Sequence, residues 1–138
     1  MADFKLVIAN AKTGKCVQQE LKSPHSNVLM GKKIGDKIDG NSINLKGYEL
    51  EITGGSDYCG FPMRHDIQGA VRKRILAVTG VGVKKIANGI KQRKTVCGNT
   101  VGEKTVQINL KVLKEGEENI FKEKEAAPKA AEAEAPKK

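Results

Sequence analysis

Cys59, His65 and Asp66 lie close together in the sequence and have the side-chain types of a nucleophilic site. A cysteine nucleophile needs a histidine within hydrogen-bond reach, and that histidine needs a group that orients it. Adjacent residues of an extended segment point in opposite directions, so Asp66 is poorly placed to orient His65. No motif of a known cysteine or serine enzyme surrounds these residues. We therefore expect no catalytic residues and no enzyme.

The same side chains, with two further cysteines and a histidine, could be metal ligands. Zinc sites in small proteins are usually marked by closely paired ligands such as Cys-x-x-Cys. Neither that spacing nor His-x-x-x-His occurs among the candidates, which are Cys16, His25, Cys59, His65 and Cys97. We expect no metal and no other cofactor.

The three cysteines are odd in number and widely scattered, which favours reduced thiols in the cytoplasm over a disulfide framework. The N-terminal residues lack the pattern of a secretory signal. No apolar stretch approaches the roughly 18 residues that a membrane span requires. We expect a cytoplasmic protein.

Positive charge is concentrated in the middle of the chain. The net charge is +9, and the segment 64–94 contains nine basic residues and only one acid, Asp66. One basic run is usually a solvated surface, but several runs almost free of acids create a local field that attracts a polyanion. The sequence thus predicts an RNA-binding surface formed by Arg64, Arg72, Lys73, Arg74, Lys84, Lys85, Lys91, Arg93 and Lys94.

Two glycine-containing segments flank these charges. Gly80-Val81-Gly82 lacks the further residues of a nucleotide-binding loop. Its glycines either let the backbone approach RNA phosphates or are ordinary turn glycines. In the segment 54–66, GGSDYCGFPMRHD, we expect the first two glycines to close a strand with positive φ. The rest is either a rigid loop packed on the body or a loop that aims Arg64 at RNA, and the two readings are compatible.

Strands must position these residues. Tyr48, Leu50 and Ile52 alternate with polar residues, and so do the apolar residues of 104–113, which is typical of half-buried antiparallel strands. Further strands are expected at 4–9, 15–21 and 34–39, and a helical turn or two within 23–32. With frequent glycines, this pattern predicts a mainly β fold, a small antiparallel β-barrel with one or two short helices, basic loops and a disordered C-terminal tail.

Composition divides the chain into two parts. Residues 1–116 are expected to form a β-barrel-like domain that binds RNA. Residues 117–138 are a low-complexity Ala/Glu/Lys/Pro tail that has too few apolar residues to fold by itself. The chain has five aromatic residues and no tryptophan. Contact with phosphates and the shape of a folded RNA is therefore favoured over base stacking on a sheet.

Longer motifs narrow the function. The segment GYELEITGGSDYCGFPMRHDIQG, with RKRIL, KQRKTVCGNTV and QINLKVLKEG, closely resembles the eukaryotic and archaeal small-subunit ribosomal protein six family. The resemblance spans most of residues 4–116. It implies a non-enzymatic constituent of the small ribosomal subunit, with a β-barrel-like body and with the cations of 64–94 facing ribosomal RNA. Neighbouring ribosomal proteins are further expected partners, and neither a membrane nor a small-molecule substrate is expected.

The C-terminal part departs from the eukaryotic pattern. Eukaryotic members carry a long basic helix that ends in phosphorylated serines, whereas this tail is short and has no serine. Phosphorylation signalling therefore does not carry over, and the short form resembles archaeal members. The alternative function is a non-integral RNA chaperone or a translation-factor-like barrel that cycles on and off ribosomes.

Overall fold

The computed structural model describes residues 3–84, 89–116 and 120–121. They form a mainly β structure with two 3-10 helices and no longer helix. The elements follow one another as β1 (Phe4–Ala9), β2 (Cys16–Leu21), η1 (His25–Leu29), β3 (Lys37–Asp39), η2 (Gly40–Ile43), β4 (Glu49–Asp57), β5 (Arg72–Ala77), β6 (Gln92–Cys97) and β7 (Thr105–Lys114). None of these helices has the length and apolar character needed to cross a lipid bilayer.

Five strands form one sheet in the order β2-β1-β7-β4-β3. Most neighbours run antiparallel, but β1 and β7 pair in parallel at the centre of the sheet. The expectation of a small antiparallel barrel is therefore not confirmed. Within the described residues, β2 and β3 remain the two edges and the sheet does not close. The mainly β class and the short helices are confirmed.

Alternation along the strands produces the hydrophobic core. In β1, Phe4, Leu6 and Ile8 point to one face and are at most 1 % exposed. Alternate residues of β4 and β7 join them because the side-chain period of a strand is two. Helices η1 and η2 and the loop after η2 close this face with Leu29, Ile43, Leu45 and Tyr48. The predicted strands at 4–9 and 104–113 and the buried positions of Phe4 and Tyr48 are confirmed.

The glycine pair at 54–55 does not end its strand. β4 continues through both glycines to Asp57, and neither has positive φ. Gly55 instead lies opposite β7, where a Cβ atom would overlap the carbonyl oxygen of Gln107. The physical requirement is close approach of two backbones rather than a turn, so the prediction of positive φ at this pair was wrong.

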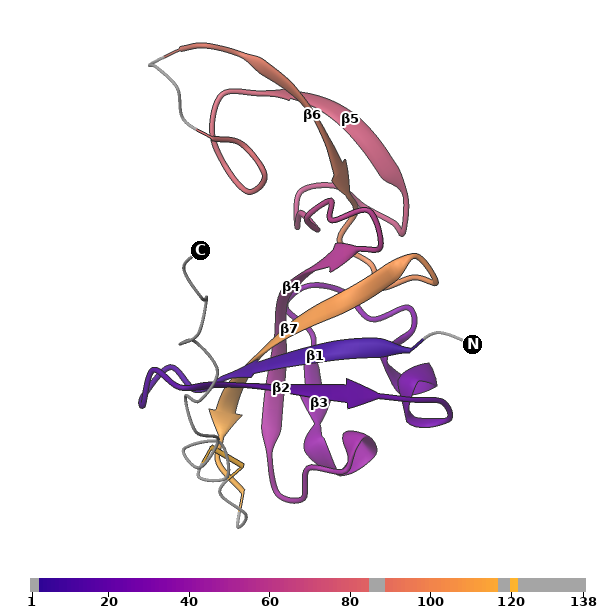
Figure 1. The fold of residues 1–138 in the computed structure, drawn as a ribbon, viewed down its shortest axis with the longest axis vertical. Helices are drawn as coiled ribbons and strands as arrows, with labels where there is room; N and C mark the ends of the chain where they lie inside the picture. Colours follow the sequence, from indigo (N-terminus) through magenta and orange to yellow (C-terminus); the bar gives the residue numbers. More distant parts are fainter. Residues whose placement is uncertain (1–2, 85–88, 117–119, 122–138) are drawn as a thin grey trace, which may run out of the picture.

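Strands β5 and β6 form a separate two-stranded sheet that extends from one end of the larger sheet (Figure 1). This hairpin is inserted between the end of β4 and the start of β7. The sequence predicted basic loops here, but most of the basic residues of 72–94 lie on strands.

In the C-terminal region, the structure describes Ile120 and Phe121, which are partly buried and pack against the core. The tail predicted at 117–138 otherwise lies outside the described residues, and its boundary stays a prediction.

Candidate nucleic-acid interface

The hairpin sorts its cations onto two faces. Directly opposed residues of an antiparallel pair share a face, and the face alternates along the strand. Arg72 pairs with Cys97, Arg74 with Thr95, and Leu76 with Arg93, and we call these six residues the arginine face. The other face, the lysine face, consists of the pairs Lys73 with Val96, Ile75 with Lys94, and Ala77 with Gln92.

The lysine face is partly covered by the chain that follows β5. A Cβ atom at Gly82 would lie 2.7 Å from Cγ of Pro62 and 3.5 Å from Cγ1 of Val96. Val96 is fully buried. Farther along the ribbon, Nε2 of Gln92 donates a hydrogen bond to the carbonyl oxygen of Lys84 at 2.8 Å. The loop 78–84 therefore folds back over this face, which also carries the ribbon's partly buried Ile75 and Ala77.

Arg64 holds that loop in place. Its Nε and Nη2 donate to the two carboxylate oxygens of Asp66 at 3.0 and 2.7 Å, and its Nη1 donates to the carbonyl oxygen of Val81 at 3.2 Å. A Cβ atom at Gly80 would lie 3.1 Å from Nη1. Gly80 has a φ of 116°, a conformation that favours glycine. The hydrogen bond from Arg64 lowers the pKa of Asp66 to about 2, and the same bond raises the pKa of Arg64.

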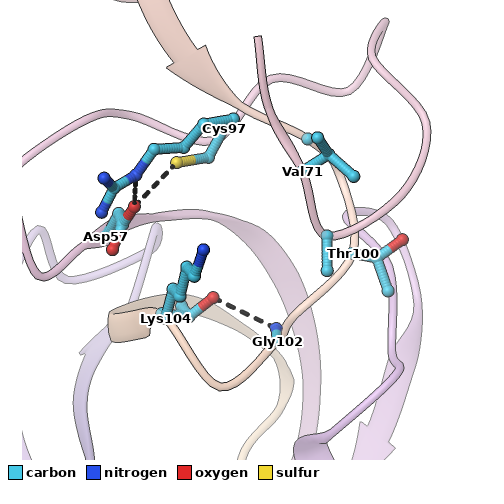
Figure 2. Close-up of a pocket in the computed structure, with 10 residues that line it drawn as sticks. Asp57, Val71, Cys97, Thr100, Gly102 and Lys104 are labelled. Carbon is cyan, nitrogen blue, oxygen red and sulfur yellow. Dashed lines mark hydrogen bonds and ion pairs between the residues drawn. The ribbon is translucent and has the colours of Figure 1, made fainter.

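A buried carboxylate joins the hairpin to the sheet. Asp57, the last residue of β4, is 4 % exposed. It accepts a hydrogen bond from Nε of Arg72, the first residue of β5, and a second at 3.4 Å from the thiol of Cys97, the last residue of β6 (Figure 2). The bond from Arg72 is the main reason that the pKa of Asp57 lies below its usual value. Burial first, and the bond to Asp57 second, raise the pKa of Cys97 to about 11.

The guanidinium of Arg72 contacts several side chains besides Asp57. Its central carbon lies 4.4 Å from the ring centroid of Tyr58 and 5.3 Å from that of Phe61, within the range of cation–π contacts. Nη2 donates to Sγ of Cys59 at 3.3 Å. The ion pair with Asp57 raises the pKa of Arg72. Arg72 is therefore a structural residue at the junction between hairpin and sheet.

A short extended segment makes the two sheets continuous. Pro62 forms an isolated antiparallel bridge with Ser56 of β4, and Met63 forms a parallel bridge with Cys97 of β6. The backbone amide of Arg64 donates to the carbonyl of Cys97 at 3.0 Å, and the amide of Cys97 donates to the carbonyl of Pro62 at 2.9 Å. Met63 is buried in the core. The segment is therefore packed between the two sheets, and whether it also aims Arg64 at RNA stays a prediction.

The segment after β6 completes the junction. The amide of Gly98 donates to the carbonyl of Val71 at 3.0 Å, and a Cβ atom at Gly98 would overlap the carbonyl oxygen of Gly69. The side-chain oxygen of Asn99 accepts hydrogen bonds from the amide of Gly69 at 3.2 Å and from the hydroxyl of Thr100 at 3.0 Å. The small cavity drawn in Figure 2, about 20 Å³, lies between these elements and has room for about one water molecule.

Eight of the nine predicted RNA-binding residues lie in the described part of the chain, and they divide into two groups. Arg64 and Arg72 form ion pairs with Asp66 and Asp57 and contact further residues of this protein. Lys85 lies outside the described residues. The remaining six are exposed and form no ion pair within the described part of the chain: Lys73, Arg74, Lys84, Lys91, Arg93 and Lys94.

Sequence reasoning missed two features of this region. It did not identify Asp57 as the anchor of the hairpin, because the aspartate lies 15 residues from Arg72 and no local pattern links them. It also missed an exposed apolar set in and around the hairpin. Four large apolar side chains are about half exposed or more: Val71, Leu76, Val81 and Ile90.

The contacts give the candidate catalytic residues other roles. Asp66 binds Arg64, and Sγ of Cys59 accepts a hydrogen bond from Arg72. In residues 3–84, 89–116 and 120–121, no three histidine, cysteine or acidic side chains are grouped as metal ligands would be.

Comparison with known proteins identifies the class. The family model described as "Ribosomal protein S6e" matches residues 4–124. A relative named small ribosomal subunit protein eS6, from Methanococcus maripaludis, is 49 % identical over 113 residues, which cover 82 % of this chain and 89 % of the relative. Proteins of the same name from Methanocella arvoryzae and Archaeoglobus fulgidus are 45 % and 43 % identical. Their alignments cover 94 % and 89 % of this chain and 89 % and 98 % of the respective relatives.

The chain is thus a ribosomal protein of archaeal type. It belongs to the ribosomal protein S6e family. The family is not enzymatic, and its members belong to the cytoplasmic ribosome. The resemblance found in the sequence motifs is confirmed. Those motifs, GGSD with FPMRHD and CGNT, converge at the junction between sheet and hairpin.

Proposed function

We propose that this protein is a structural constituent of the small ribosomal subunit, and that its hairpin binds and stabilises folded ribosomal RNA. The relatives are named as small-subunit proteins. The observation that carries the RNA-binding part is the set of six exposed cations on and beside the hairpin, which have no carboxylate partner within the described residues. Unneutralised cations held on a fixed scaffold attract phosphates with little further ordering cost.

The rigid junction supports the same proposal. Cations on a mobile loop lose conformational entropy when they bind, whereas this ribbon is continuous with the sheet through the segment 61–64. Arg72 and Arg64 contribute indirectly, by fixing the ribbon and the loop against it. Neighbouring ribosomal proteins are the second class of partner that we propose.

Crosslinking of intact small subunits tests the proposal. We expect crosslinks from the peptides that cover residues 73–94 to ribosomal RNA, and we expect the protein to remain on small subunits through a high-salt wash. Crosslinks confined to the five-stranded sheet would place the RNA elsewhere. Release by the wash would favour a factor that cycles on and off the ribosome.

A further inference from the structure

We infer that RNA docks on one face of the hairpin only, the arginine face, and that Leu76 makes an apolar contact at the centre of that interface. The inference rests on the proposed RNA binding and adds which surface is used and which form of RNA it fits. The arginine face is the side of the ribbon that the loop 78–84 does not cover.

Coverage distinguishes the two faces. On the lysine face, Val96 is fully buried and the loop 78–84 lies over the ribbon. On the arginine face, Arg74, Leu76 and Arg93 are all exposed. Lys73 and Lys94 of the lysine face are exposed as well, but the loop 78–84 covers part of that face. A partner can therefore approach the arginine face along the ribbon with less obstruction.

Charge determines what the open face can bind. Arg74 and Arg93 form no ion pair within the described residues, and Arg72 at the base of the same face is neutralised by Asp57. Two free guanidinium groups without a neighbouring acid fit a polyanion, and their planar forks match phosphate oxygens. A protein partner would have to supply its own carboxylates to the same positions.

Leu76 identifies the form of the RNA. It is 58 % exposed, lies directly opposite Arg93, and is two residues from Arg74 on the same face. An apolar side chain flanked by two arginines fits a surface where sugars lie between phosphates. The wide, shallow minor groove of a double-helical RNA presents such a surface to a flat ribbon. We therefore assign double-helical ribosomal RNA as the occupant.

Two double variants compare the faces at equal charge. R74A/R93A removes two cations from the arginine face, and K73A/K94A removes two from the lysine face of the same strands. Binding to deproteinised small-subunit RNA is measured across a salt series. We expect R74A/R93A to weaken binding about tenfold or more and to reduce the slope of log K against log salt by about 1.4–1.8. K73A/K94A should have a clearly smaller effect, because Lys73 and Lys94 would contribute to the overall positive potential of the hairpin rather than to direct phosphate contacts.

The outcomes separate this inference from the proposed function. Equal losses in the two variants, or a larger loss in K73A/K94A, would overturn the one-face docking but leave RNA binding in place. No loss in either variant would contradict RNA binding by the hairpin. R74K/R93K serves as a second variant that keeps the charge. It should lose affinity with the slope nearly unchanged, because lysine cannot form the forked contact.

The apolar contact has its own test. L76A should weaken binding about three- to tenfold without changing the salt slope, because no charge is removed. V28A is the matched control, since Val28 is 43 % exposed on η1 of the sheet body. Wild-type affinity of L76A would overturn the central role of this residue. Competition by single-stranded RNA as strong as that by an RNA duplex would overturn the double-helical occupant.

Discussion

The five-stranded sheet and the β5–β6 hairpin treat charge in opposite ways. On the sheet, cations stand opposite acids: Lys5 pairs in register with Glu20, and Lys37 and Lys111 both pair with Glu51. On the hairpin, the exposed cations pair in register with neutral residues. The sheet therefore neutralises its own surface, and the excess positive charge of the protein is concentrated on the element that projects from it. An interface is indicated by the missing counter-charges more than by the number of cations.

The two regions also differ in how they treat apolar side chains. The sheet buries Leu6, Ile8, Leu50 and Ile108 completely. The hairpin leaves Leu76 mostly exposed, and its only fully buried strand residue is Val96. The sheet is thus expected to supply the folding free energy, while the hairpin depends on its junction for a fixed position.

Core truncation should give the largest effect on stability. I108A leaves a cavity among fully buried side chains of the sheet and should lower the free energy of unfolding by about 2–5 kcal/mol. L76A, in the hairpin, should change it by less than about 0.5 kcal/mol. Chemical denaturation of both variants checks the contrast. Similar losses would show that the hairpin shares the core's role.

Loss of the anchoring carboxylate should have the next largest effect. D57N keeps the shape of the side chain but weakens the bonds to Arg72 and Cys97, at a cost of about 1–3 kcal/mol. D66N is the matched control, because its carboxylate is exposed and should cost much less. Hydrogen exchange should show faster opening of β5 and β6 in D57N. If D57N instead only tightened RNA binding, by releasing Arg72, the junction role would be contradicted.

Acid should weaken the same junction. The pKa of Asp57 is lowered in the folded protein, mainly by the bond from Arg72, so this carboxylate stabilises the fold above its unfolded pKa of about 3.9. That contribution is lost as the pH falls from about 4 toward the lowered folded value. The unfolding free energy of the wild type should therefore decrease over this range more steeply than that of D57N. Parallel curves for the two proteins would argue against the pairing.

The smallest effect concerns the cysteines. Cys97 is partly buried and its pKa is raised to about 11, whereas Cys16 and Cys59 are exposed. Alkylation at pH 8, followed by mass spectrometry of the peptides, should label Cys97 about tenfold or more slowly than the other two. D57N should narrow the difference. Equal labelling of all three thiols in the wild type would contradict a closed junction.

The sequence predicted the sheet better than the hairpin for a physical reason. β1 and β7 bury one face, so alternation in their residues predicts them as strands, and most of their bounds are confirmed. β5 and β6 face solvent or a loop and carry cations on both sides, so no period-two pattern marks them. The open sheet was missed because the parallel pairing of β1 with β7 joins the two ends of the domain, which local patterns do not predict.

The predicted RNA interface stays a prediction, but the structure shows that two of its nine residues are already engaged in contacts within the protein. Charge counting identifies the segment 64–94, because unneutralised cations are visible in composition. It does not separate Arg64 and Arg72 from the others, because their partners Asp66 and Asp57 are recognised only once the chain is folded. Whether the remaining cations bind RNA stays a prediction.

The most direct test compares RNA binding by two variants of equal net charge. One carries alanine at four hairpin cations, Lys73, Arg74, Arg93 and Lys94, and the other at four exposed cations of the sheet body, Lys5, Lys12, Lys37 and Lys111. With small-subunit RNA, we expect the hairpin variant to reduce the slope of log K against log salt by about 2, mostly through its two arginines, and the sheet variant to leave it nearly unchanged. Equal reductions would contradict the hairpin as the RNA-binding element.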